Sequence, residues 1–232
     1  EADPDEMFQL ACNKGFRAYA ITDHSDHCSD VDDPELVGMA KQDWRKETAE
    51  SFAYMKEMQQ RYRNKETKLL AGIELGEPLQ DLEIANQIVK LEYDVVLGSL
   101  HNTAGEQDFY YIDFKCMDNN QITDLMQRYF TELLAMVKWG QLDVLAHLTY
   151  PCRYMAKQGV TVELTQFDEL VSDIFREMAK TDKALEINTS GLCHPEGGTL
   201  PGERHVKLFR DLGGKYITVG SDSHKPETHG AG

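Results

Sequence analysis

The sequence predicts an α/β fold in which parallel strands close into a single barrel. Short β-type runs alternate with amphipathic helical segments along the chain, and this alternation implies parallel strands joined by right-handed crossovers. Nearly every run ends in a polar residue that can bind a metal. In an open sheet, only the strand ends at a switch point meet, whereas a closed barrel gathers all its carboxyl strand ends around one mouth. The barrel is therefore favoured.

Six β-type runs predict the strands, and five of them end in His, Asp or Glu. The five are 18–24, 69–74, 95–101, 144–147 and 216–224, and the sixth is 184–188. A lone His after a strand is usually a hydrogen-bonded loop residue. Five such endings in one chain indicate strands that deliver ligands to a common point.

Helices are predicted between these runs from apolar residues at helical spacing. The first helix begins at Asp3-Pro4, which supply an N-cap and a first-turn proline, and it ends at Lys14-Gly15. The others are expected at 43–62, 79–91, 122–139, 164–179 and 200–212. The longest excursions, 23–43 and 101–119, both leave from ligand-bearing strand ends, where functional loops concentrate.

Composition limits the partners and the setting. The 232 residues can form one domain spanning 1–232, with a single core. A formal charge of −16 argues against nucleic acid or an anionic membrane as partner, because both require clustered Lys and Arg. No apolar stretch approaches the roughly 18 residues of a membrane span. The five cysteines are odd in number and widely spaced, which predicts reduced thiols and a cytoplasmic protein.

The strand ends supply six candidate metal ligands: His24, Glu74, His101, His147, Asp222 and His224. Imidazoles and carboxylates without a thiolate suit Zn²⁺, Mn²⁺ or Fe, and disfavour Ca²⁺ or a structural cysteine-type zinc site. Six donors exceed the needs of one catalytic ion, so at least two metals are expected. Paired metals suit phosphoester hydrolysis, because one generates hydroxide near neutral pH and both screen charge on the attacking and leaving oxygens.

Further residues are candidates for catalysis and for substrate binding. Asp23 is expected to act with Glu74 and Asp222 in catalysis, and Asp23 and Asn188 to orient ligands or substrate. Arg153, soon after His147, is the candidate phosphate clamp, because a guanidinium fork matches phosphate oxygens. A solvated surface arginine is the alternative for Arg153. Weaker candidates for contacts with phosphate, substrate or metal are Arg17, Lys225, His27, His194, His205 and His229.

Two cysteines, Cys152 and Cys193, lie near predicted strand ends and have the position of a nucleophile. No activating spacing of His and Cys is present, and a metal-activated hydroxide makes a covalent nucleophile unnecessary. Both are therefore interpreted as residues outside the chemistry.

The ligand-bearing segments resemble, in order and spacing, the motifs of the polymerase-and-histidinol-phosphatase (PHP) metallophosphoesterases. The segments are Thr22-Asp23-His24, Gly72-Ile73-Glu74-Leu75-Gly76, Gly98-Ser99-Leu100-His101, Ala146-His147 and Gly220-Ser221-Asp222-Ser223-His224. Phe109-Tyr110-Tyr111-Ile112-Asp113 and the chain length resemble the stand-alone histidinol-phosphatase branch.

This resemblance implies a TIM-like, distorted (β/α)7 barrel with a trinuclear centre that hydrolyses L-histidinol phosphate in histidine biosynthesis. It also implies that His24, His101 and His147 are imidazole ligands and that Glu74 is a bridging carboxylate. Asp222 and His224 would be the ligand pair of the last strand. The implied cofactors are two to three divalent ions, and the implied substrate is a small phosphomonoester.

The family's first motif, a His-x-His after its first strand, is absent from this sequence. That strand and two ligands are therefore expected upstream of Glu1, and a last helix after the chain's end. Domain 1–232 is accordingly expected to be a PHP-type domain truncated at both ends. A parallel barrel that lacks one strand exposes two unpaired edges.

Three classes of function remain open from the sequence. The favoured class is a small-molecule phosphomonoesterase, with L-histidinol phosphate as substrate. The second is a PHP-type protein-tyrosine phosphatase or other phosphoesterase. The third is a metal-binding module without turnover. The oligomeric state has no signal in the sequence.

Overall fold

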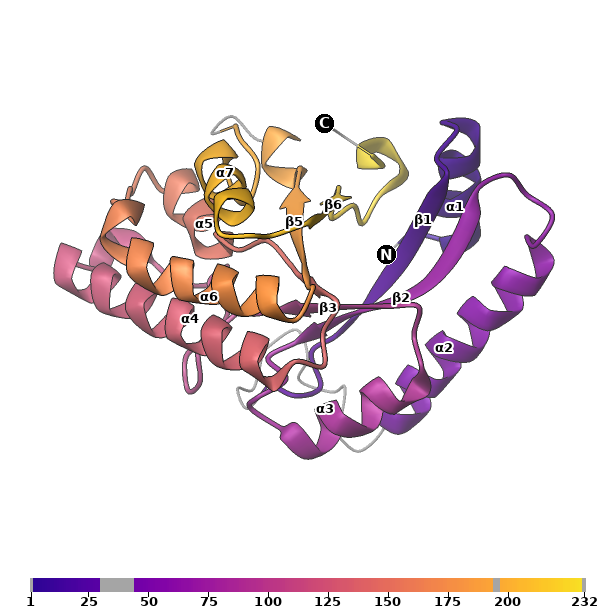
Figure 1. Ribbon diagram of the computed structural model, residues 1–232, viewed down its shortest axis with the longest axis horizontal. Helices are drawn as coiled ribbons and strands as arrows, with labels where there is room; N and C mark the ends of the chain where they lie inside the picture. The colour runs from indigo at the N-terminus through magenta and orange to yellow at the C-terminus, as the bar shows by residue number, and fades with distance from the viewer. Residues whose placement is uncertain (1, 30–43, 194–196, 231–232) are drawn as a thin grey trace.

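The computed structural model describes residues 2–29, 44–193 and 197–230 of the chain. Its centre is one sheet of six parallel strands that follow each other in chain order and curl into a half-barrel (Figure 1). The strands are β1 (Ala18–Ser25), β2 (Lys68–Gly76), β3 (Val95–Ser99), β4 (Val144–Leu145), β5 (Ala184–Asn188) and β6 (Tyr216–Gly220). All six predicted strands and the parallel, TIM-like architecture are confirmed.

The two edges of this sheet are β1 and β6, which within the described ranges each pair with a single neighbour. Three apolar side chains of β6 are exposed: Tyr216 by 53%, Ile217 by 42% and Val219 by 73%. By contrast, Ala184, Leu185 and Glu186 of the adjacent β5 are all buried. A seventh strand preceding Glu1 stays a prediction.

Seven α-helices cover the described part of the sheet. They are α1 (Pro4–Asn13), α2 (Trp44–Arg61), α3 (Leu82–Ile88), α4 (Asn119–Trp139), α5 (Tyr150–Lys157), α6 (Asp168–Lys180) and α7 (Glu203–Asp211). Single 3₁₀ turns are η2 (Val89–Leu91), η3 (Phe114–Cys116), η4 (Leu164–Phe167), η5 (Ser190–Cys193) and η6 (Pro226–Thr228). Only α5 was not predicted from the sequence. It is short and carries Pro151 in its first turn.

Local sequence explains where the helices begin and end. The Asp3 side chain accepts a hydrogen bond from the Asp5 amide, and Pro4 opens α1 as predicted. Helix α4 begins with a capping box between Asp118 and Gln121. It ends at Gly140, whose φ of 79° is the left-handed conformation that glycine adopts without strain.

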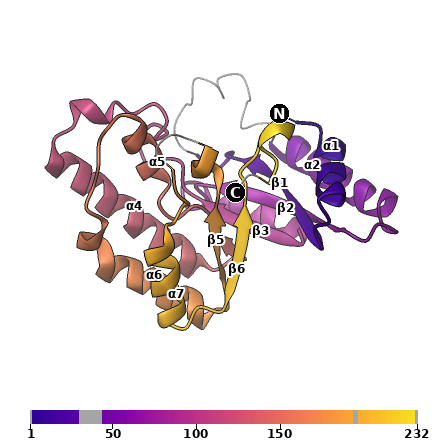
Figure 2. The same ribbon diagram turned by 90° about the horizontal axis from the view of Figure 1, so that it is seen from above.

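The apolar core has two main parts of unequal size. The larger lies between the central strands and helices α4 and α6, and includes Phe130, Met136 and Phe175, which are fully buried. The smaller lies under α1 and α2, and its buried members are Phe8, Met55, Met58, Leu69 and Ala71. Figures 1 and 2 show the corresponding division of the helices between the two ends of the sheet.

The segment after β6 crosses from the last strand towards the first helix. Its η6 turn contacts α1, and Lys14 Nζ donates a hydrogen bond to the His229 carbonyl oxygen. The His229 ring lies against the rings of Phe16 and Tyr19. The segment after β6 therefore reaches the amino end of β1, although the two strands are not hydrogen-bonded neighbours in the described part of the sheet. No helix in the described ranges is long and apolar enough to span a membrane.

Candidate metal centre

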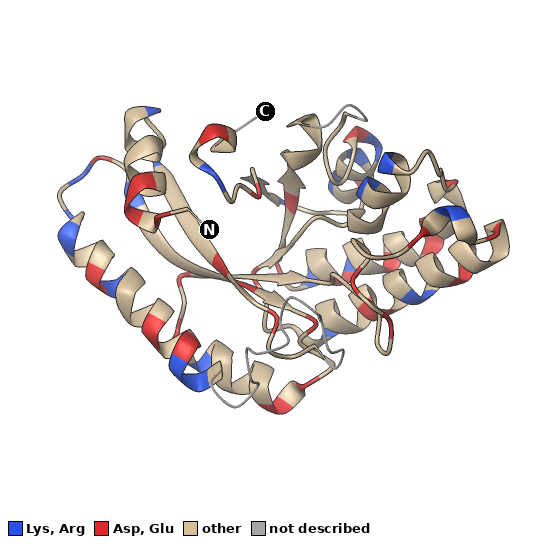
Figure 3. Cartoon of the chain, turned by 180° about the vertical axis from the view of Figure 1, so that it is seen from behind, with Lys and Arg blue, Asp and Glu red and all other residues tan. Residues whose placement is uncertain are grey.

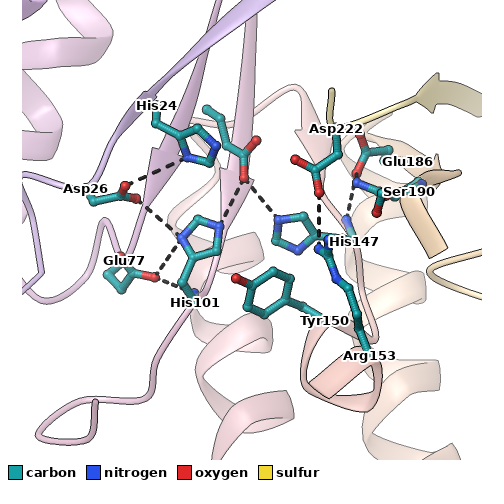
Figure 4. A network of polar contacts seen from close by, with 12 residues as sticks. His24, Asp26, Glu77, His101, His147, Tyr150, Arg153, Glu186, Ser190 and Asp222 are labelled. Atoms are coloured by element: carbon teal, nitrogen blue, oxygen red, sulfur yellow. Dashed lines mark hydrogen bonds and ion pairs between the residues drawn. The ribbon is translucent and has the colours of Figure 1, made fainter. Parts of the chain in front are cut away.

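The predicted ligands meet where the strands reach their carboxyl ends. Figure 4 shows four of them: His24, His101, His147 and Asp222. The β1–β2 register places His24 directly beside Glu74. His101, His147 and Asp222 each stand two residues beyond the end of their strand. Because the strands are parallel and their ends share one side of the sheet, these side chains converge.

Three of the residues form an inner group, which consists of Glu74, His101 and His147. One oxygen, Glu74 Oε1, lies 3.2 Å from His101 Nε2 and 3.0 Å from His147 Nε2. All three side chains are buried. A single buried carboxylate oxygen therefore stands between two imidazoles.

The other three form an outer group, which consists of His24, Asp222 and His224. One ligand atom from each lies within 4.8 Å of the others, and the same holds for His24, Glu74 and His101. His24 thus connects the two groups. The rings of His24 and His224 stack with their centroids 5.3 Å apart. His224 has a side chain that is 48% exposed, so the outer group reaches the rim of the site.

The donor set fits divalent metal ions of the Zn²⁺ type. Imidazole nitrogens and carboxylate oxygens are their usual ligands, at about 2.0–2.2 Å. The 4.8 Å spacing requires only small side-chain shifts to reach such distances. His147 is buried, and its Nδ1 has no hydrogen-bond partner among the described residues. A buried polar atom without a partner is costly, so a ligand at this imidazole would remove that cost.

Charge coupling within the cluster shifts the pKa values of its members. Burial opposes ionisation of Glu74, but the neighbouring His24, His101 and His147 outweigh it and hold the pKa of Glu74 well below its usual value. Glu74 in turn raises the pKa of His24. Burial also acts against the charge of Asp222, yet His224 and Arg153 lower its pKa to about 2. The carboxylates are therefore ionised ligands at neutral pH.

Two carboxylates that the sequence analysis did not select, Asp26 and Glu77, surround the other nitrogen of His101. His101 Nδ1 lies 3.3 Å from Asp26 Oδ1 and 3.5 Å from Glu77 Oε1. A carboxylate on one imidazole nitrogen orients the other nitrogen towards a metal, and here that other nitrogen, Nε2, faces Glu74. Gly76 provides the room, because a Cβ there would lie 2.2 Å from Asp26 Oδ1.

A third carboxylate that the sequence analysis did not select, Glu186, lies on the other side of the inner group. Its Oε2 accepts a hydrogen bond from the backbone amide of His147 at 2.8 Å. Burial raises the pKa of Glu186 to about 7. The only available signal was its place beside Asn188 in β5, and a polar residue inside a strand is too common to select it.

Two predicted residues lie beside the cluster rather than in it. Asp23 Oδ2 accepts a hydrogen bond from Ser51 Oγ of α2 at 2.8 Å, consistent with strand alternation that turns Asp23 away from His24. Asn188 is buried, and its amide bonds to Glu186 and Ser190. The catalytic role of Asp23 and the substrate-binding role of Asn188 stay predictions.

Arg153, on α5, lies at the cluster. Its Nη2 is 3.1 Å from Asp222 Oδ2, and its guanidinium lies over the rings of Tyr150 and Tyr154 at 4.9 and 5.5 Å. The side chain is only 12% exposed. The alternative of a solvated surface arginine is therefore wrong.

The weaker candidates lie outside the cluster. His27 faces Glu47, His205 lines a cavity of about 440 Å³ between α5 and α7, and His229 packs against aromatic rings. His194 lies outside the described residues, as does part of the 23–43 excursion. Cys152 is not activated, because burial raises the pKa of its thiol to about 12.

Comparison with known proteins identifies the family and the fold of this chain. The PHP domain model matches residues 1–190. A probable histidinol-phosphatase of Thermotoga maritima is 30% identical over 169 residues, covering 68% of this chain and 70% of the relative. A second, from Clostridium acetobutylicum, is 28% identical over 182 residues, covering 76% of this chain and 68% of the relative.

A solved structure has the same fold. The histidinol phosphate phosphatase of Lactococcus lactis subsp. lactis, complexed with Zn, L-histidinol and phosphate, superimposes with a TM-score of 0.72. It is 23% identical, and the match covers 97% of this chain and 81% of that one.

The relatives are named histidinol-phosphatases, and this chain has a curled parallel half-barrel with imidazoles and carboxylates at its strand ends. Together these findings identify it as a hydrolase of the metal-dependent class. The chain belongs to the PHP domain family.

Proposed function

We propose that this protein is a metal-dependent phosphomonoesterase that hydrolyses L-histidinol phosphate to L-histidinol and phosphate. The observation that carries the proposal is the convergence of His24, Glu74, His101, Asp222 and His224 in two overlapping groups of ligand atoms. The histidinol-phosphatase names of the relatives support the substrate. The five free cysteines support a cytoplasmic setting.

The proposed cofactors are two to three divalent ions, Zn, Mn or Fe, held by the inner and outer groups. When bound, such ions lower the pKa of water and screen the charge of a phosphate ester. The position of Glu74 between two imidazoles supports its role as the shared carboxylate. Asp222 and His224 would complete the set from β6.

Arg153 is proposed to bind the substrate phosphate. Its guanidinium already bonds to a carboxylate oxygen of Asp222, and phosphate oxygens offer the same acceptor geometry. The guanidinium lies over the rings of Tyr150 and Tyr154, and these contacts limit its freedom to move. If a bound metal neutralised Asp222, Arg153 would be available to bind the phosphate in its place.

The rest of the substrate carries an ammonium and an imidazole, which suit an acidic surrounding. Asp26 and Glu77 lie beside His101 in addition to the predicted carboxylates. Figure 3 shows that Lys and Arg lie mostly on the covering helices. This distribution supports a small cationic phosphomonoester over nucleic acid.

The test is a comparison of kcat/KM among four substrates. L-Histidinol phosphate, a generic aryl phosphate, a phosphotyrosine peptide and a dinucleotide are assayed with the same metal-loaded protein. The proposal expects the highest kcat/KM for histidinol phosphate, and loss of activity on chelation with recovery on metal addition. A preference for the peptide would establish the tyrosine-phosphatase alternative. Metal binding without turnover of any substrate would establish a binding module.

A further inference from the structure

We propose that Glu186 is a positioning residue that holds His147 in its ligand geometry by binding its backbone amide. This inference rests on the proposed metal centre. His147 has a φ of 21°, which is uncommon for a residue with a side chain. Such a conformation persists only where its surroundings impose it.

The sheet itself stops before His147. β4 pairs with β5 through Val144 and Leu145 only, and the next amide, of Ala146, donates to the Gly98 carbonyl on the β3 side. The following amide, of His147, has no strand carbonyl as its acceptor. Glu186 Oε2 takes this hydrogen bond at 2.8 Å. The Glu186 side chain of β5 thus adds one hydrogen bond beyond the end of the β4–β5 pairing, at His147.

The Glu186 carboxylate is itself fixed by its neighbours. Asn188 Nδ2 donates to the same oxygen at 3.3 Å. Asn188 Oδ1 accepts from Ser190 Oγ at 2.6 Å and from the Ser190 amide at 3.1 Å. On the β6 side, Gly220 leaves room for the carboxylate, because a Cβ there would lie 1.9 Å from Glu186 Oε1. These contacts form a brace (Glu186, Asn188 and Ser190) that is buried behind His147.

The same arrangement occurs at the second inner histidine, which supports the inference. The buried Glu77 accepts a hydrogen bond from the backbone amide of His101. Glu77 directly follows β2, the strand that precedes β3 and His101, whereas Glu186 lies in β5, the strand that follows His147. Each of the two inner histidines therefore has its backbone amide bound by a buried glutamate. Figure 4 shows Glu77 and Glu186 on opposite sides of the cluster.

The test compares Glu186→Ala, Glu186→Gln and the matched control Leu185→Ala. Gln keeps an acceptor for the His147 amide and loses the charge, whereas Ala loses both. Leu185 is buried and adjacent on the same strand, facing away from the brace. The primary readout is the Zn²⁺ affinity of chelator-treated protein, measured by competition with a chromophoric chelator. The secondary readout is amide hydrogen exchange at His147.

We expect Glu186→Ala to weaken Zn²⁺ affinity by about 10- to 100-fold, the usual cost of losing a group that orients a ligand. Glu186→Gln should bind close to the wild-type value, and Leu185→Ala should lower the melting temperature but keep the affinity. Equal loss in Glu186→Gln and Glu186→Ala would overturn the inference, because Glu186 would then act through its charge. Normal affinity in Glu186→Ala would overturn it as well.

Different results would contradict the proposed metal centre and the proposed role of Glu186. Wild-type protein that binds no metal would contradict the proposed function. The brace would then be judged from hydrogen exchange alone. Faster exchange of the His147 amide in Glu186→Ala than in Leu185→Ala supports it, and equal exchange in the two variants overturns it.

Discussion

The inner and outer groups of the cluster hold the same kinds of ligand in different ways. Glu74, His101 and His147 are buried on the central strands, and Glu77 and Glu186 bind the backbone amides of the two histidines. The outer residues come from β1 and β6, the two edges of the sheet. His224 is about half exposed, and Asp222 bonds to Arg153.

This difference indicates that the inner group is formed before metal binds, whereas the outer group depends on what binds there. Neighbouring strands and buried carboxylates fix the inner imidazoles without a metal. The outer residues belong to strands that do not pair with each other, so a shared metal would be a direct connection between them.

The largest expected effect comes from removing one carboxylate of each group. Glu74→Gln should lower kcat by more than about 100-fold, because a ligand contributes more than the 10- to 100-fold of the groups that orient it. It should also release metal from both groups, since Glu74 is adjacent to His24, His101 and His147. Metal content and kcat of the purified variant are the measurements.

Asp222→Ala is the matched change in the outer group. It should lower kcat by a similar factor, with the fold intact and the inner metal retained. Elemental analysis and circular dichroism check these two expectations. Near-normal activity with unchanged metal content would assign Asp222 a structural role.

A smaller effect is expected from Arg153, which lies at the outer group only. Arg153→Ala should raise KM about tenfold and change kcat less, because the arginine binds the phosphate of the ground state. Arg153→Lys should not restore KM, since an ammonium lacks the planar fork that packs on Tyr150 and Tyr154. Steady-state kinetics decide the point, and an unchanged KM in Arg153→Ala would exclude the phosphate role.

The pH dependence of stability should differ between the metal-free and metal-loaded protein. Glu74 raises the pKa of His24. Burial acts against the charge of His101, yet Tyr150 and the surrounding carboxylates hold the pKa of His101 well above its usual value. A folded-state pKa above the unfolded value of about 6.5 stabilises the fold at lower pH, and the contribution is lost as pH rises through the folded pKa. Glu74 has a lowered pKa, and its contribution to the stability of the folded state is complete above about pH 5.

The metal-free melting temperature should therefore fall as pH rises above the unfolded histidine pKa of about 6.5, by about 2–4 °C for each kcal/mol lost. The melting temperature of the metal-loaded protein should fall less over the same pH range, because bound ions would replace the protons on the imidazoles. Differential scanning fluorimetry with a chelator and with Zn²⁺ measures both curves. A metal-free curve that rises over this range would contradict the assigned charge states.

The parts of the cluster that could be predicted are those in which a strand ends on its ligand. His24 and Glu74 end apolar runs and are register partners in the β1–β2 pair, and His101, His147 and Asp222 follow two residues after their strands. Asp26, Glu77 and Glu186 could not be found this way. Their roles depend on tertiary contacts that leave no periodic trace, such as the room provided by Gly76 and Gly220.

The helices show the same limit. α4 is long, amphipathic and capped, and its predicted extent was nearly right. α5 is short, and the residues that precede it pack into the site rather than mark a helix start. It nevertheless carries Tyr150, Arg153 and Tyr154 to the cluster. Elements positioned by the fold around them are the ones that sequence patterns miss.

An anomalous difference map from crystals of the metal-loaded protein, collected at the zinc absorption edge, tests the proposed metal centre directly. We predict at least two peaks at the strand ends, one adjoining Glu74 and one adjoining Asp222, each about 2.0–2.2 Å from imidazole nitrogens or carboxylate oxygens. Protein with Zn²⁺ bound only elsewhere, or with no peak among these residues, would contradict it.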